Sequence, residues 1–76
     1  MMDFGDAIRA LKSGKLVARA GWNGKGMWLA LQVPDAQSKM GEPYIYLRTV
    51  AGTLVPWNPN NIDMLATDWF VVTLPN

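Results

Sequence analysis

Residues 16–33, LVARAGWNGKGMWLALQV, decide the fold of this 76-residue chain. Two apolar segments flank a glycine-rich turn, and Asn23-Gly24 within that turn is a strong signal for a β-hairpin. The flanking segments 16–20 and 27–33 are therefore predicted to be neighbouring strands. Because a hairpin connection forces antiparallel pairing, the sheet that contains them is predicted to be antiparallel.

The segment before the hairpin is predicted to be a helix over residues 3–12. Asp3 is a plausible N-cap, and Ser13-Gly14 supplies the stop signal at the other end. One apolar stripe, at the spacing that an amphipathic helix requires, is formed by Phe4, Ala7, Ile8 and Leu11. This stripe predicts that the helix packs on one face of the sheet.

The remaining residues add three strands and a short helix. Residues 34–43 are polar and are predicted to be an exposed loop, followed by strands at 44–48 and 53–55 and a last strand at 69–74. Asn58-Pro59 is predicted to begin a second helix that runs to about Ala66, with Ile62, Leu65 and Ala66 facing the core. The fold class is therefore α+β: a single domain over residues 1–76, with an N-terminal helix on a curved antiparallel sheet of about five strands and one short extra helix.

The composition excludes several function classes. The chain has no Cys and no His, so it lacks a thiolate nucleophile, the usual zinc ligands and a proton shuttle for neutral pH. We therefore expect no enzyme activity, no metal site and no cofactor. Seven Lys and Arg against six Asp and Glu leave a net charge of +1, which does not favour nucleic acid as a partner.

The small size of the chain favours association with a second subunit. A domain of this length buries only about 60% of the surface of its unfolded chain, and it has no disulfide or metal to stabilise it. The longest clearly apolar stretch, residues 27–31, is too short to cross a membrane, so we expect a soluble cytosolic protein.

Four tryptophans in 76 residues are more than a small core readily buries. Trp22 lies in the glycine-rich turn, where it either belongs to an ordinary hairpin turn or stacks on a ligand. Trp57 lies between Pro56 and Pro59, where it either caps the core or offers a flat, rigid platform for a nucleobase. Trp28 and Trp69 lie within strands and are interpreted as core or subunit-interface residues.

Charged groups near these tryptophans are candidates for ligand contacts. Arg19 precedes the Trp22 turn and is either a phosphate contact or an exposed strand charge. Asp63 is a candidate for a sugar or base contact, whereas Asn61 and Asp68 are interpreted as structural. No pair of carboxylates suggests glycosidase chemistry.

Several motifs together closely resemble the second Thoeris anti-defence family of small phage and prophage proteins, over almost the whole chain. The more specific motifs are Arg19-x-Gly21-Trp22-Asn23-Gly24-Lys25-Gly26-Met27 and Asp63-Met64-Leu65-Ala66-x-Asp68-Trp69. They are accompanied by Phe4-x-x-Ala7-Ile8-x-x-Leu11-Lys12-x-Gly14-Lys15, Pro43-Tyr44-Ile45 and Val55-Pro56-Trp57-x-Pro59.

This resemblance implies a protein that sequesters a signal without chemistry. Members of the family bind the cyclic ADP-ribose isomer made by a bacterial TIR-domain sensor, and some also bind cyclic dinucleotides. They are homotetramers with nucleotide pockets between protomers, and they act in the host bacterial cytoplasm. Carried onto this sequence, the resemblance implies a ligand site made of Phe4, Arg19, Trp22, Asn23, Gly24, Tyr44, Trp57 and Asp63.

Within that implied site, the resemblance gives each group a role. Trp22 and Trp57 would stack on bases, and Arg19 would contact a phosphate. Asn23 and the Gly24 backbone would make polar contacts, and Asp63 would contact sugar or base. Phe4 would line the pocket from the helix, and Tyr44 would close one wall.

Two other functions remain open from the sequence. The exposed tryptophans would equally suit a protein-interaction module that binds another chain. Single-stranded nucleic acid is a weaker option, because a net charge of +1 provides little attraction for a phosphate backbone.

Overall fold

The computed structural model describes residues 1–22 and 25–74 of the chain. Its elements, in chain order, are α1 (Phe4–Lys12), β1 (Leu16–Arg19), β2 (Trp28–Gln32), β3 (Tyr44–Arg48), β4 (Leu54–Pro56), α2 (Asn61–Leu65) and β5 (Trp69–Val72). Within the described part of the chain the strands form one antiparallel sheet in the order β4-β3-β2-β1-β5. The α+β class predicted from the sequence is confirmed.

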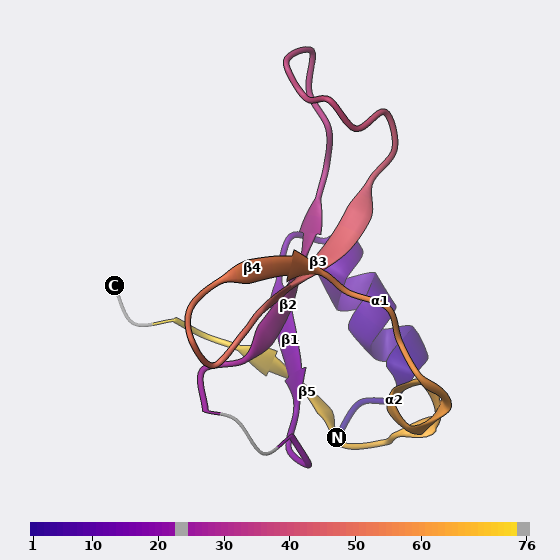
Figure 1. Ribbon diagram of the computed structural model, residues 1–76. Coiled ribbons are helices and arrows are strands. Elements are labelled where there is room, and N and C mark those ends of the chain that lie inside the picture. Colours follow the sequence, from indigo (N-terminus) through magenta and orange to yellow (C-terminus); the bar gives the residue numbers. More distant parts are fainter. Residues whose placement is uncertain (23–24, 75–76) are drawn as a thin grey trace.

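Helix α1 covers one face of this sheet (Figure 1). Asp3 caps the helix as predicted: its carboxylate accepts the backbone N–H of Asp6, and Asp6 accepts the N–H of Asp3 in return. The helix ends at Lys12 with Ser13 as its C-cap, and Gly14 follows with a φ of 91°, a conformation that favours glycine. The predicted N-cap and the predicted stop signal of α1 are therefore both confirmed.

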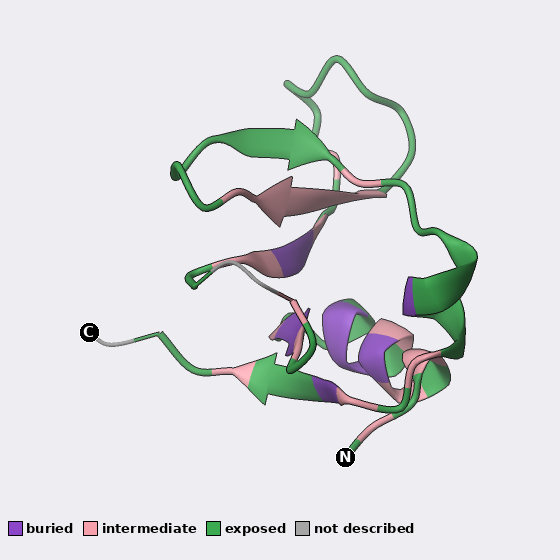
Figure 2. Ribbon diagram, turned by 60° about the horizontal axis from the view of Figure 1, so that its bottom comes forward, coloured by how far each residue is buried: buried purple, intermediate pink, exposed green. Residues whose placement is uncertain are grey.

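The core lies between α1 and the sheet (Figure 2). Its centre consists of buried side chains from the helix and from three strands: Ala7, Ala10, Leu11, Val17, Leu29 and Trp69. Alternate residues of a strand point to opposite faces. The other face of the sheet therefore carries Ala18 and Ala30, which are buried but do not belong to this core.

The second helix differs from the prediction in its start and in its orientation. Its N-cap is Asn60, whose side chain accepts the backbone N–H of Asp63, so the helix does not begin at Asn58-Pro59. The backbone N–H of Trp57 donates to the Ile45 carbonyl next to β4, so the chain is still extended at this point. The helix therefore begins further along the chain. Asp63 is the buried residue of α2, whereas Ile62 and Leu65 are 72% and 81% exposed, so the prediction that these two face the core is wrong. Ala66 packs against the core as predicted.

The loop over residues 33–43 projects from the end of the sheet (Figure 1). Asp35 organises part of it, because its carboxylate accepts both the backbone N–H of Gln37 and the hydroxyl of Ser38. No helix in the described ranges is long and apolar enough to span a membrane.

Candidate ligand site

Four aromatic side chains meet beside α1 and form what we call the aromatic cluster: Phe4, Trp22, Trp57 and Trp69. Trp69 is fully buried at its centre, with ring centroids 5.5 Å from Trp22, 6.1 Å from Trp57 and 5.6 Å from Phe4. Trp22 and Trp57 each meet Trp69 edge to face, an arrangement that aromatic pairs favour. Trp22 and Trp57 are half-buried, so each packs on the core and keeps part of its ring exposed.

An ion-pair network, which we call the anchor network, holds the aromatic cluster and consists of Arg19, Asp63 and Asp68. The Arg19 guanidinium donates to Asp68 Oδ1 and to Asp63 Oδ1, both at 2.8 Å. The same Asp63 oxygen accepts the indole N–H of Trp22 at 3.2 Å, and the Asp63 backbone carbonyl accepts the indole N–H of Trp69 at 3.0 Å. Asp63 therefore fixes two of the four rings through hydrogen bonds.

Sheet pairing brings the anchor network together. Arg19 pairs with Trp69 in the β1–β5 ladder, so Asp68 lies beside Arg19 at the edge of that pair. The Arg19 and Asp63 side chains are only 14% and 11% exposed, so the alternative of an exposed strand charge is wrong for Arg19. Asp68 also accepts the Gly21 backbone N–H at 2.8 Å, and a Cβ at Gly21 would lie 2.9 Å from that carboxylate. A side chain at Gly21 would therefore force the Asp68 carboxylate to move.

The anchor network shifts the ionisation of two of its members. The Arg19 guanidinium, which donates to both Asp68 oxygens, holds the pKa of the Asp68 carboxyl below its ordinary value. In return, Asp68 and then Asp63 raise the pKa of Arg19 further above the range in which it could lose its charge. These two shifts favour the charged forms of Arg19 and Asp68.

We expect the stability of the domain to depend on acid pH through this network. A carboxyl whose pKa is lowered by folding stabilises the folded state above its unfolded pKa of 3.8, and that stabilisation is lost as the pH falls through the lower folded pKa. The pKa values of Asp6 and Asp35 are also lowered, by Arg9 and by the Gln37 backbone N–H respectively, so they add to the same effect. Urea unfolding should give a nearly constant free energy between about pH 5 and 7, because the chain has no His, and a lower value below pH 3.8.

The matched control is Asp68→Asn, which should weaken the dependence on acid pH because it removes one of the titrating groups. A fall in stability between pH 7 and pH 5, or an unchanged acid dependence in Asp68→Asn, would contradict this account of the network.

A groove with a volume of about 540 Å³ lies at the Trp22 end of the sheet and extends over the face opposite α1. Its lining residues come from β1, β2, β3, β5 and the glycine-rich turn, and they are Ala18, Arg19, Ala20, Trp22, Lys25, Gly26, Met27, Trp28, Arg48, Phe70, Val72 and Leu74. This volume lies within the range of small-molecule sites. Among these described lining residues three are basic and none is acidic, so the groove suits an anionic ligand with apolar surface.

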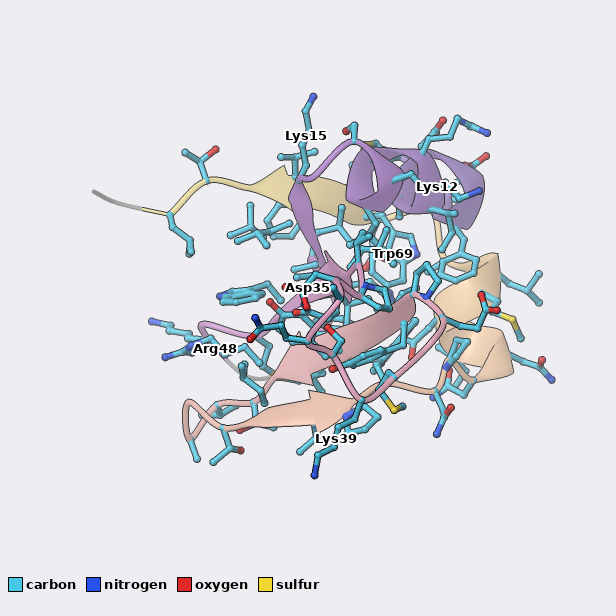
Figure 3. All side chains as sticks on the ribbon, turned by 90° about the horizontal axis from the view of Figure 1, so that it is seen from above. Lys12, Lys15, Asp35, Lys39, Arg48 and Trp69 are labelled. Atoms are coloured by element: carbon cyan, nitrogen blue, oxygen red, sulfur yellow. The ribbon has the colours of Figure 1, made fainter. Side chains whose placement is uncertain are left out.

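Arg48 lies at the turn end of this groove. Its Nη1 donates to the Gly26 carbonyl at 2.7 Å and to the Thr49 carbonyl at 3.4 Å, which holds the guanidinium beside the turn. Figure 3 shows the Arg48 side chain well away from α1, whereas Trp69 lies close to the helix. Basic charge is therefore placed on the open side of the sheet.

The structure places the predicted site residues in three regions. Phe4, Trp57 and Asp63 belong to the aromatic cluster and the anchor network, whereas Arg19 and Trp22 also line the groove. Tyr44 lies elsewhere, in a smaller hollow of about 260 Å³ next to the 33–43 loop. Asn23 and Gly24 lie outside the described residues, so their predicted roles stay predictions.

The sequence interpretation missed three groove residues, Trp28, Arg48 and Phe70. Trp28 is half-buried on the open face, where its ring meets Tyr46 edge to face at 6.2 Å. The alternation of side chains along each strand shows which face of its own strand each residue lies on. Only the order and register of the strands show that the three residues lie on the same face of the sheet. Across residues 1–22 and 25–74, no three acidic side chains gather as a metal ion would require.

Comparison with known proteins identifies the family. The model of the Thoeris anti-defense 2-like domain matches residues 2–72. The chain is also 36% identical to a protein of Bacillus phage SP01 named Thoeris anti-defense 2, over 95% of this chain and 96% of that protein. With a match over nearly its whole length, the chain belongs to the Thoeris anti-defense 2 family.

Proposed function

We propose that this protein is a phage or prophage anti-defence protein that binds a cyclic ADP-ribose isomer and sequesters it unchanged. The signal would be withheld from the effector of bacterial Thoeris immunity inside the infected cell. Membership of the Thoeris anti-defense 2 family supports the part of the proposal that names Thoeris as the defence system counteracted. The groove supports the mode of action, because a basic and aromatic lining suits a ligand with bases and phosphates.

The chemistry of the site favours binding over catalysis. With no His or Cys in the chain, the acid–base candidates at the groove are the Lys25 amine and the neighbouring carboxylates. Asp63 and Asp68 both accept hydrogen bonds from Arg19, so they are engaged as structural anions. The single observation that carries the proposal is this combination: a cationic, aromatic groove whose neighbouring carboxylates are occupied by the chain itself.

The proposed contacts follow the residues named from the sequence. Trp22 lies at one end of the groove and would contact a base. Asn23 and Gly24, which follow it in the sequence, would add polar contacts. Trp57 and Phe4 would contribute from the aromatic cluster, and Tyr44 from the far end of β3. Arg19 would face a phosphate with the N–H groups that its two carboxylate partners leave available.

A homotetramer is part of the proposal, and exposed apolar residues support it. Ile62 and Leu65 on α2 are 72% and 81% exposed, and Leu54 on the edge strand β4 is 61% exposed. A chain this small gains most by covering such residues with a second copy. The same residues would also suit a protein-interaction module, which remains the second candidate.

Isothermal titration with a panel of cyclic ADP-ribose isomers and cyclic dinucleotides tests the proposal, alongside a sizing column. We expect a saturable heat with at least one cyclic ADP-ribose isomer and elution as a tetramer. A chain that binds no member of the panel, in any oligomeric state, would contradict nucleotide sequestration and favour the interaction module.

A further inference from the structure

The glycine-rich turn contributes to the groove, and different groups hold its two halves. The anchor network fixes the first half, because Asp68 accepts the Gly21 backbone N–H at 2.8 Å and Asp63 accepts the Trp22 indole N–H at 3.2 Å. The second half, residues 25–27, gives three consecutive residues to the groove lining, and we call it the turn wall. Among the described residues, Arg48 is the one whose side chain makes a hydrogen bond to the turn wall.

The contact between Arg48 and the turn wall is short and leaves little free space. Nη1 of Arg48 donates to the Gly26 carbonyl at 2.7 Å, a distance typical of a charge-assisted hydrogen bond. Gly26 has a φ of 79°, and a Cβ at this position would lie 3.0 Å from the same nitrogen. In the described ranges Arg48 forms no salt bridge, so its partners there are the backbone carbonyls of Gly26 and Thr49.

Arg48 reaches the turn wall from a part of the sheet that is held on both sides. It is the last residue of β3 and pairs with β2 on one side and with β4 on the other. Backbone hydrogen bonds close the turn that follows, from Thr49 to the Thr53 carbonyl and from Gly52 to the Thr49 carbonyl, both at 2.9 Å. Because Arg48 also donates to the Thr49 carbonyl, at 3.4 Å, it links this closed turn to the turn wall.

We infer that Arg48 is a positioning residue for the groove. It sets the place of the turn wall through the Gly26 carbonyl, so this side of the groove is formed before a ligand enters. A site that is ordered in advance binds more tightly, because less conformational freedom is lost on binding. For its ligand the inference rests on the proposed function, whereas the order of the turn wall is a property of the free chain.

Nitrogen-15 relaxation of the free chain tests the link between Arg48 and the turn wall. Arg48→Met removes the guanidinium and keeps an apolar stem. We expect the backbone order parameters of residues 25–27 to fall from about 0.85, the value of a rigid backbone, towards about 0.6. Those of residues 49–53 should change little, because that turn is closed by its own hydrogen bonds.

Isothermal titration with the cyclic ADP-ribose isomer that the unmodified chain binds measures the consequence. Arg48→Met should weaken binding by about 5- to 30-fold, which corresponds to ordering one backbone residue on binding. Arg48→Lys should restore part of both the order and the affinity. Its ammonium group can donate to the Gly26 carbonyl but lacks the planar geometry of the guanidinium.

Two glycine variants test the same link without changing the charge of Arg48. Gly26 and Gly14 have φ values of 79° and 91°, so alanine introduces similar backbone strain at both positions. At Gly26 the new Cβ would displace the Arg48 guanidinium, whereas at Gly14 it meets no atom within 4 Å. Gly26→Ala should therefore loosen the turn wall and weaken binding, and Gly14→Ala should lower stability but leave affinity unchanged. Circular dichroism checks that both variants fold.

The possible outcomes separate the role of Arg48 from the proposed function. If Arg48→Met weakens binding but leaves the order of the free turn wall unchanged, Arg48 contacts the ligand itself and the positioning role is wrong. If the turn wall loses order and affinity stays the same, or if Gly14→Ala weakens binding as much as Gly26→Ala, the positioning role is also wrong and the proposed function stands. If the unmodified chain binds no cyclic nucleotide, the proposed function fails, and the role of Arg48 in binding fails with it.

Discussion

Replacing Trp69 with alanine is expected to remove a large part of the folding free energy of the protein. Trp69 is fully buried and touches the rings of Phe4, Trp22 and Trp57, so its removal leaves a cavity at the centre of the aromatic cluster. Such a substitution costs about 3–5 kcal/mol. A domain of 76 residues has a total stability of about 4–11 kcal/mol, so the loss is between roughly a quarter of that stability and all of it.

Urea unfolding followed by circular dichroism measures this effect, at one fixed protein concentration because subunit association would stabilise the folded state. Trp69→Phe is the matched variant: it keeps an aromatic ring but removes the indole N–H that donates to the Asp63 carbonyl. Its loss of stability should be clearly smaller. A Trp69→Ala protein within about 1 kcal/mol of the unmodified chain would show that the cluster is not the centre of the core.

Replacing Asp63 with alanine is expected to cost about 3 kcal/mol of folding free energy. The substitution leaves one Arg19 nitrogen and the Trp22 indole N–H without their acceptor in a region that is largely closed to water. Removing one partner of a buried ion pair typically costs 3–5 kcal/mol, and we take the lower value because Asp68 still neutralises Arg19. Trp22 would also lose the contact that fixes its ring, so ligand affinity should fall.

Thermal unfolding and titration of the same preparation measure both effects. Asn61→Ala, an exposed position on the same helix, provides the control and should change stability by no more than about 0.5 kcal/mol. Asp63→Asn should be intermediate, because its side-chain oxygen can still accept the Trp22 N–H but carries no charge. Equal stability of Asp63→Ala and Asn61→Ala would contradict the role that we assign to the anchor network.

Much of the fold could be predicted from local signals. The Asp3 cap, the Ser13-Gly14 stop and the alternation of apolar residues act within a few residues, so α1, β1 and β2 were placed correctly to within a residue or two. The second helix was harder to predict from local signals. Its start depends on the backbone of Trp57, which remains paired beside β4, and its buried side depends on an ion pair with Arg19 from a distant strand.

The candidate site could be predicted only in part for the same reason. Trp22, Trp57 and Asp63 were singled out by their residue types and by the family resemblance, and the structure brings them together around Trp69. The ion pair of Asp68 with Arg19 could not be predicted without knowing that β5 pairs with β1. The groove could not be predicted without the complete strand order, because Trp28, Arg48 and Phe70 come from three different strands.

The central claim is that the protein holds its ligand without altering it. The most direct measurement is to incubate the chain with a cyclic ADP-ribose isomer, remove free ligand on a desalting column, denature the protein by heat and identify the released nucleotide by mass spectrometry. Sequestration predicts that the cyclic isomer is recovered intact. Recovery of a ring-opened or hydrolysed product, or of no nucleotide at all, would contradict it.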